Sequence, residues 1–204
     1  MLSFDQRATL ALNGLYTPFT DGAWKLLSGP AVWVVGCSLL IAYLFVRLGW
    51  KKALVAVGAC LLTFALADRT SVFVKEAVAR LRPCWDEDML AAGLRVLEGK
   101  GGRYGFFSAH AANAAGLALC SFLCLRSDRS PSRRGYAFLA FGLATLVGIS
   151  RIFVGKHYLG DVLTGFAAGL LLGWLSAAIG RWFIGRMQAP PARSERTQRD
   201  GESA

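Results

Sequence analysis

Long apolar runs separated by short polar segments make up most of the chain. Residues 26–46 (LLSGPAVWVVGCSLLIAYLFV) and 162–180 carry no charged side chain, and residues 104–125 carry only a histidine. Two further runs, about 53–76 and 135–154, are apolar with their charges gathered toward one end. Because a helix crosses a bilayer with about 20 apolar residues, each run is long enough to span it. The pattern predicts an all-α, polytopic membrane bundle of five transmembrane helices.

The N-terminal segment has a different pattern. Residues 4–27 mix Leu, Phe and Trp with Asp, Lys and Thr, and Thr17-Pro18 interrupts them. This mixture is typical of helices that lie along a membrane surface. It is unlike a cleavable signal peptide, because Asp5 and Arg7 precede only a short apolar run. We expect one or two interfacial helices here; the alternative is a sixth, shorter span.

These patterns divide the chain into three parts. Residues 1–28 form the interfacial N-terminal segment, and residues 29–187 form the transmembrane domain. Residues 188–204 are polar, contain proline and lack apolar periodicity. We expect this tail to be disordered.

The charged residues indicate how the bundle is oriented. The chain is 54% hydrophobic, with a mean hydropathy of +0.43 and a formal net charge of +10. One side receives Lys51, Lys52, the basic loop 126–135 and the basic tail, whereas the other side receives the charge-balanced loop 84–104. Because cytoplasmic loops are rich in Lys and Arg, we expect loop 84–104 of a cell (inner, cytoplasmic) membrane protein to face the periplasm or exterior. Topology therefore accounts for much of the charge, and we expect no nucleic acid partner.

The cysteines and histidines form no metal-binding motif. Four of the five cysteines, Cys37, Cys60, Cys120 and Cys124, lie in apolar runs and are predicted to be small core residues, whereas Cys84 stands alone in a loop. There is no CxxC pair, and the two histidines lie 47 residues apart. We expect neither a metal ion nor a cofactor.

Three cations lie at the ends of apolar runs, on the side predicted to face outward. The second run ends in KEAVARLRP (75–83), where Lys75 and Arg82 are seven residues apart. This spacing predicts that both project from one helical face before Pro83 stops the helix. Arg151 ends the fourth run on the same side. Ionisable groups are costly in a bilayer and are usually kept for function or pairing, although each cation alone could also snorkel to the interface.

Both histidines lie on this same side. His110 falls in the first turn of the third run, after Ser108, a candidate N-cap whose helix end offers unpaired N–H groups to an anion. His157 and Asp161 are four residues apart, so on a helix the carboxylate can bind one imidazole nitrogen and leave the other free. A purely structural His–Asp pair is the alternative. Together, three cations at a helix N-terminus predict a phosphate pocket, and the histidines predict a nucleophile and a general acid.

Three motifs carry a resemblance to a known family. K-x6-RP at 75–83, Ser-x-His at 108–110 and SR-x5-H-x3-D at 150–161 are similar, in order and spacing, to the signature of the type 2 phosphatidic acid phosphatase superfamily. This superfamily comprises membrane lipid phosphatases related to the vanadium haloperoxidases. The resemblance covers about residues 26–185, and the compact size is similar to that of the small bacterial members.

The resemblance implies a metal-independent reaction through a phospho-histidine. His157 would attack the phosphorus with its ring oriented by Asp161, while His110 would protonate the leaving oxygen and then activate water. The phosphoryl oxygens would be held by the remaining positions of the motifs, which are Lys75, Arg82, Ser108, the amide of Ala109, and Arg151. The substrate partner would be a phosphorylated lipid in the bilayer.

The middle motif departs from the family pattern. The family usually has Pro-Ser-Gly-His, where this chain has Phe107-Ser108-Ala109-His110. Glycine tolerates a positive φ that alanine does not, so Ala109 can offer its N–H to phosphate only if its φ is negative. The backbone at this position therefore decides whether the substitution matters.

Several functions and substrates stay open at this level. A vanadate-dependent haloperoxidase, an anion or phosphate transporter and a non-catalytic lipid-binding relative are the alternatives. Undecaprenyl diphosphate is the favoured substrate; phosphatidylglycerol phosphate, phosphatidic acid and lipid A 1-phosphate are the others. The flanking cations Arg80, Arg103 and Lys156 could bind a second phosphate or anchor the interface, loop 99–105 could act as a lid, and Asp68-Arg69 could be a buried pair or part of the pocket wall.

Overall fold

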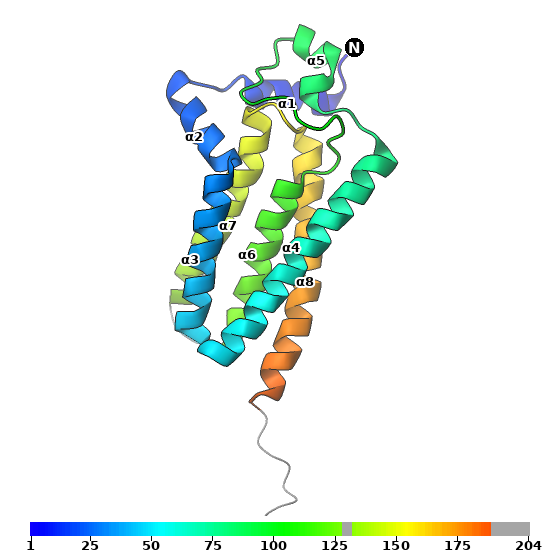
Figure 1. Ribbon diagram of the computed structural model, residues 1–204. Helices are drawn as coiled ribbons and strands as arrows, with labels where there is room; N and C mark the ends of the chain where they lie inside the picture. Colours follow the sequence, from blue (N-terminus) through cyan, green and yellow to red (C-terminus); the bar gives the residue numbers. More distant parts are fainter. Residues whose placement is uncertain (128–131, 189–204) are drawn as a thin grey trace, which may run out of the picture.

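The computed structural model describes residues 1–127 and 132–188, and this part of the chain is almost entirely helical (Figure 1). The elements are α1 (Phe4–Asn13), α2 (Pro18–Ser28), α3 (Pro30–Leu48), α4 (Trp50–Val78), η1 (Pro83–Trp85), α5 (Glu87–Ala91), α6 (Ala109–Cys124), η2 (Leu125–Ser127), α7 (Ser132–Phe153) and α8 (Leu159–Arg186). The predicted disordered tail, apart from its first residue, and the middle of the basic loop 126–135 lie outside the described residues. The long helices run along one another as a single bundle.

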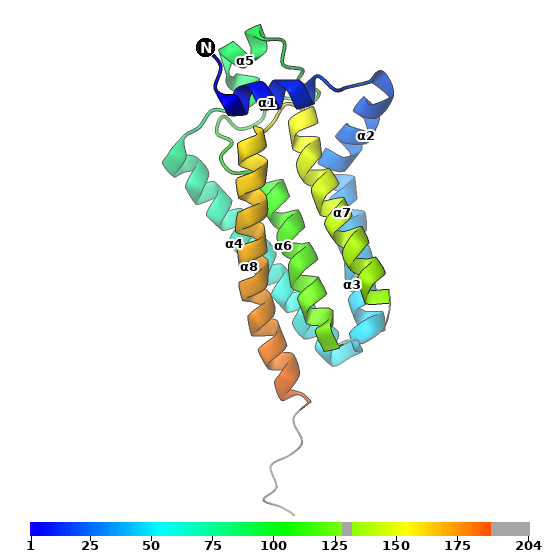
Figure 2. The ribbon, with the colours of Figure 1, turned by 180° about the vertical axis from the view of Figure 1, so that it is seen from behind.

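The predicted membrane-spanning architecture is confirmed, with one helix shorter than expected. Helices α3, α4, α7 and α8 are long and apolar enough to cross a bilayer. Helix α6 begins at Ala109, and its 16 residues extend only about 24 Å, against a hydrocarbon core of about 30 Å. It lies among α4, α7 and α8. The N-terminus of α6 lies inside the bundle, below the ends of α7 and α8 that lie nearest to α1 (Figures 1 and 2).

Glycines allow α6 and α8 to pack backbone against backbone. Gly165, Gly169 and Gly173 lie four residues apart on one face of α8. A Cβ at Gly169 would lie 2.1 Å from the carbonyl oxygen of Ala112, and one at Gly173 would lie 2.4 Å from that of Gly116. Small residues at this spacing are a common way for membrane helices to approach closely. The contact sets the register of α8 on α6.

The N-terminal segment forms two helices broken where the sequence predicts. Thr17 caps α2 with its hydroxyl, and Pro18 is the first residue of that helix. Helix α1 lies across one end of the bundle, and α2 leads from it down to α3 (Figure 2). Asn13 ties α1 to the bundle, because its Nδ2 donates to the carbonyl oxygens of Ile152 (3.0 Å) and Phe153 (3.1 Å). We call the end that α1 crosses the site end; its position at a membrane surface stays a prediction.

The cysteines of the apolar runs lie in or near the core, as the sequence predicts, and the cysteine outside those runs is buried as well. All five cysteines are free, and four of them are buried, whereas Cys37 is half-buried. Cys84 is buried although it lies outside the apolar runs.

Asp68 and Arg69 were candidates for a buried pair, but both side chains are exposed on α4. Both therefore lie on the surface of α4 rather than in the interior of the bundle, and the charge of Asp68 acts on Lys75.

Candidate active site

The end of α4 differs from the single helical face that we predicted. Lys75 lies in the last turn of α4, which stops at Val78, because Ala79 adopts a left-handed conformation with φ of 50°. Arg82 therefore lies beyond the helix, in an extended segment that leads into η1. Pro83 is not what ends α4. The charges of Lys75 and Arg82 still act on each other, but the turn at Ala79 brings the two residues near rather than helical periodicity.

A loop pairs with this extended segment and covers Arg82. The backbone N–H of Arg82 donates to the carbonyl of Arg103 at 3.0 Å, and that of Gly105 donates to the carbonyl of Arg80 at 2.9 Å. Nε of Arg82 donates to the carbonyl of Tyr104 at 3.0 Å. A Cβ at Gly105 would lie 2.9 Å from Cγ of Arg82, so a larger residue would push the loop away. The loop thus holds the Arg82 guanidinium in place.

The predicted lid segment lies directly over two cations. A Cβ at Gly101 would lie 3.3 Å from Nζ of Lys156 and 3.4 Å from Nη1 of Arg82. Lys156 is buried and donates its ammonium group to the carbonyl of Gly99. Lys156 is therefore engaged by the loop, whereas the Arg103 side chain is exposed. That the loop opens and closes as a lid stays a hypothesis.

Helix α6 begins at Ala109, as the middle motif predicts. Ser108 is fully buried and acts as the N-cap, accepting a hydrogen bond from the N–H of Ala111 at 3.4 Å. His110 lies in the first turn, and its ring stands edge-on to Trp33 at 5.7 Å between centroids. Among the described non-glycine residues only Ala79 has a positive φ, so Ala109 does not need the freedom of glycine. The departure from the family pattern leaves the Ala109 N–H at the helix N-terminus intact.

Arg151 approaches the same place from the end of α7. The side chain is buried, and Nη1 donates to the hydroxyl of Ser28 and, at 3.3 Å, to its carbonyl. Glu98 is 3.9 Å from Nη1. Among the described residues, Nε of Arg151 has no hydrogen-bond partner. A buried guanidinium donor without a partner is unusual, and an anion bound beside Arg151 would satisfy it.

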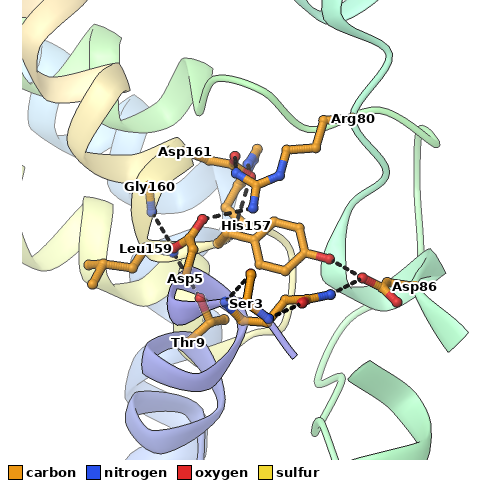
Figure 3. A network of polar contacts seen from close by, with 11 residues as sticks. Ser3, Asp5, Thr9, Arg80, Asp86, His157, Leu159, Gly160 and Asp161 are labelled. Carbon is orange, nitrogen blue, oxygen red and sulfur yellow. Dashed lines mark hydrogen bonds and ion pairs between the residues drawn. The ribbon is translucent and has the colours of Figure 1, made fainter. Parts of the chain in front are cut away.

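His157 lies in the loop between α7 and α8 and is only 2% exposed. Its Nδ1 is 3.4 Å from Oδ2 of Asp161 in the first turn of α8, close but without a hydrogen bond among the described residues. The carboxylate of Asp161 is already engaged, because Oδ2 accepts the N–H of Tyr158 at 3.1 Å and Oδ1 accepts Nη1 of Arg80 at 2.8 Å. The His–Asp pair that the sequence predicts is therefore present, with a carboxylate fixed from two further sides (Figure 3).

Burial and nearby cations keep His157 uncharged. Its pKa lies well below the usual value of 6.5, first because the ring is buried and then because Arg151, Arg82 and Lys75 oppose a second positive charge. The pKa of Arg82 is also lowered by burial. At neutral pH the imidazole of His157 therefore has a lone pair available for attack, which an imidazolium would lack.

The structure brings the predicted residues together. The charges of Lys75, Arg82 and Arg151 act on both histidines, and the two histidines act on each other. The N–H of Ser108 donates to the carbonyl of Asp161 at 3.0 Å, which joins the start of α6 to the start of α8. The hydroxyl of Ser108 accepts the cap hydrogen bond of α6, as expected of an N-cap, and its O–H can still donate to a phosphate. Among the described residues, no three His, Cys, Asp or Glu side chains could hold a metal ion together.

Sequence reasoning missed the residues that support this arrangement. Arg80 was a candidate for a second phosphate, but its guanidinium pairs with Asp161 and with Asp5 of α1. Tyr158 and Ser28 hold Asp161 and Arg151 through hydrogen bonds. Asp5 and Ser28 lie in the N-terminal segment, far from every motif in sequence. Only the tertiary contacts reveal them, because no spacing rule connects such distant positions.

Comparison with known proteins agrees with the geometry. Residues 53–184 match the PAP2 superfamily. Lipid A 4'-phosphatases from Porphyromonas gingivalis and Bacteroides thetaiotaomicron are each 33% identical to the chain, over 85% and 91% of its length and 71% and 80% of theirs. Phosphatidylglycerophosphatase B from Bacillus subtilis is 29% identical over 80% of the chain and 73% of its own length.

Two solved structures share the fold. The crystal structure of a transmembrane PAP2 type phosphatidylglycerolphosphate phosphatase from Bacillus subtilis superposes with a TM-score of 0.68 at 23% identity, covering 87% of this chain and 84% of that one. Aquifex aeolicus LpxE gives a TM-score of 0.61 at 20% identity, covering 86% and 95%. These likenesses extend the sequence match to the whole bundle. The chain therefore belongs to the PAP2 superfamily, and it is a phosphatase, a phosphoric-ester hydrolase embedded in a membrane.

Proposed function

We propose that this phosphatase hydrolyses a phosphate group from a membrane lipid through a phospho-histidine at His157. The observation that carries the proposal is a buried, uncharged His157 beside a fixed carboxylate and three cations. Nδ1 faces Asp161, which leaves Nε2 to attack the phosphorus. A nitrogen–phosphorus bond forms as the bond to the lipid oxygen breaks. His110, which takes up a proton once the bound phosphate offsets the surrounding cations, gives that proton to the oxygen.

The second step regenerates the enzyme. His110, now deprotonated, removes a proton from water, and the water oxygen attacks the phosphorus as the bond to His157 breaks. Free phosphate leaves. Lys75, Arg82 and Arg151 offset the negative charge of both transition states, together with the N–H groups at the start of α6, such as that of Ala109. The 3.4 Å contact between His157 and Asp161 is expected to shorten when the ring becomes charged.

An apolar groove supports a lipid as the substrate. It is formed by α3, α6 and α7 and has a volume of about 640 Å³. Trp33 lines the groove and also contacts His110, so the groove begins beside the reacting centre. It continues along α3 past Gly36 to the stacked rings of Tyr43 and Tyr136, whose centroids are 4.9 Å apart. A hydrocarbon chain lying in this groove would place its phosphate near His110.

The relatives suggest which lipid phosphates to test first. Two of them, at 33% identity, are named lipid A 4'-phosphatases, so a phosphomonoester on an acylated sugar is our first candidate. Phosphatidylglycerol phosphate is the second, because the relative at 29% identity is named phosphatidylglycerophosphatase B. Undecaprenyl diphosphate, which the sequence favoured, stays a prediction for the same assay.

The experiment is phosphate release by purified protein in detergent, across these lipids and phosphatidic acid. Activity on at least one lipid phosphate is expected, together with inhibition by vanadate, which mimics the five-coordinate transition state. EDTA should have no effect, and EDTA-sensitive turnover would contradict a metal-independent reaction. Phosphate uptake into proteoliposomes without hydrolysis would support a transporter, and halide oxidation with vanadate and peroxide would support a haloperoxidase.

The orientation is a separate part of the proposal. We place the site end at the periplasmic or exterior face of the cell membrane, because basic residues such as Lys51, Lys52, Arg181 and Arg186 lie toward the opposite end of the bundle. A reporter fused after Met187, active only in the cytoplasm, tests this topology. Activity of a reporter inserted at Gly93, on the site end, would contradict it.

A further inference from the structure

The N-terminal helix reaches the catalytic centre through one arginine. Asp5 of α1 accepts Nη2 of Arg80 on its Oδ2 at 2.7 Å, and the same guanidinium donates Nη1 to Oδ1 of Asp161 at 2.8 Å. Asp161 is the carboxylate beside His157. Figure 3 shows Arg80 between the two carboxylates, with Asp5 rising from α1 below. A chain of polar contacts therefore runs from α1 to the proposed nucleophile.

Arg80 is held on a further side as well. Its guanidinium lies 4.0 Å from the centroid of the Tyr158 ring, and the hydroxyl of Tyr158 donates to Oδ2 of Asp86 at 2.5 Å. Gln6 of α1 donates Nε2 to the same oxygen at 2.9 Å. Although burial lowers it, the pKa of Arg80 is raised overall by the hydrogen bond that its guanidinium donates to Asp5 and by the charge of Asp161. The guanidinium is thus locked in one orientation.

Helix α1 also caps the helix that carries Asp161. Asp5 accepts the N–H of Gly160 on Oδ1 at 2.9 Å, and Thr9 accepts the N–H of Leu159 at 3.0 Å. These are among the first N–H groups of α8, which have no partner inside their own helix. A Cβ at Gly160 would lie 2.8 Å from Oδ2 of Asp5, so a larger residue there would displace the Asp5 carboxylate. Asp5 therefore fixes both Arg80 and the start of α8.

We propose that Asp5 and Arg80 are positioning residues, through which α1 orients the Asp161 carboxylate toward His157. The inference rests on the proposed function of His157. Arg80 has no part in binding a second phosphate under this assignment, because both of its terminal nitrogens are held by carboxylates. Without this support, Asp161 is held only through Oδ2 by the N–H of Tyr158, so the carboxylate can turn relative to Nδ1 and orients the ring of His157 less well. The chemical step slows, whereas binding of the phosphate by Lys75, Arg82 and Arg151 is unchanged.

The test separates kcat from KM in variants of the two residues. Arg80→Leu is expected to lower kcat about 100-fold, the cost of a misplacement of about 1 Å at a reacting centre. Arg80→Lys should recover part of that loss, because an ammonium restores the charge but pairs less well with two carboxylates. Asp5→Asn is expected to lower kcat about 5-fold, and KM should stay within about twofold throughout.

The chain offers a closely matched control. Asp21 of α2 pairs with Arg95 at 2.6 Å, with side-chain exposures of 19% and 27%, against 2.7 Å, 26% and 30% for Asp5 and Arg80. Arg95 also lies over a tyrosine ring, that of Tyr16, at 3.3 Å. This pair ties the N-terminal segment to the bundle without touching Asp161. Asp21→Asn should therefore leave kcat unchanged.

A double-mutant cycle distinguishes positioning from a loss of stability. If Asp5 acts through Arg80, Asp5→Asn should change kcat less than twofold in the Arg80→Leu background, because coupled residues are non-additive. An additive loss, an equal loss in Asp21→Asn, or a rise in KM without a fall in kcat would each overturn the proposal. These outcomes require an active unmodified protein. Absence of phosphate release from that protein on every lipid would instead overturn the proposed function.

Discussion

Two stretches of helix α8 have opposite roles. In the first turn, the N–H groups of Leu159 and Gly160 bond to side chains of α1, and Asp161 faces His157. One turn further on, the glycines at 165, 169 and 173 bring the backbone of α8 against that of α6. The first stretch makes polar contacts that orient Asp161. The second stretch makes close backbone contacts that fix the position of α8 against α6. The difference indicates that close packing positions the helix that carries Asp161, while the polar contacts orient its carboxylate.

The largest expected effect comes from removing the proposed nucleophile beside the polar stretch. His157→Ala should lower kcat at least about 1,000-fold, because no other group can form the phospho-enzyme. The melting temperature should change little in comparison, since the packing of α6 on α8 is untouched. Phosphate release and thermal unfolding in detergent measure the two quantities. Turnover by His157→Ala at the unmodified rate would refute the mechanism.

Removing one cation from the proposed phosphate site should have the next largest effect. Arg82→Gln is expected to lower kcat/KM about 100-fold, in the range seen when one donor to a developing charge is lost. The pKa of His157 should rise as well, because removing a positive charge makes protonation easier. The acidic limb of the kcat/KM profile should therefore move to higher pH, toward 6.5. A loss of activity with an unmoved acidic limb would contradict the predicted electrostatic contact.

The packing of α8 on α6 can be disrupted without altering any polar side chain. In Gly169→Leu, the Cβ alone would meet the Ala112 carbonyl oxygen at 2.1 Å, so α6 and α8 must separate. We expect a loss of about 1–3 kcal/mol of stability, or failure to fold, with activity falling in parallel. Gly142→Leu on α7 is the control, because nothing lies within 4 Å of its Cβ. Equal melting temperatures for the two variants would show that the glycine contact is unimportant.

The smallest effect is expected at the position where the chain departs from its family. Ala109→Gly should change kcat/KM less than about threefold, because the backbone already has a negative φ and offers the same N–H. It should cost about 0.5–1 kcal/mol of stability, as glycine does near the start of a helix. Steady-state kinetics and thermal unfolding measure both. A large gain in activity would mean that Ala109 distorts the phosphate site.

Much of the site could be predicted because its residues lie in short motifs. His110 follows Ser108 within one turn, and His157 and Asp161 are four residues apart, so local geometry brings each pair together. The membrane-spanning helices could be predicted for a similar reason, since length and hydropathy alone decide whether a helix can cross a bilayer. Prediction was wrong where one residue's backbone decided the outcome. The left-handed turn at Ala79 ended α4 before Pro83, and alanine gives no signal for such a turn.

The amino-acid sequence by itself determined the membrane-spanning character, the family and the set of charged and imidazole groups at one end of the bundle. These properties depend on composition and on spacing over a few residues. The tertiary structure alone decided that α6 packs among α4, α7 and α8, that Arg151 is held by Ser28, and that Arg80 joins Asp5 to Asp161. The physical reason is distance along the chain. Contacts between residues separated by 75 positions or more, as in Asp5–Arg80, depend on how whole helices pack, which no local pattern specifies.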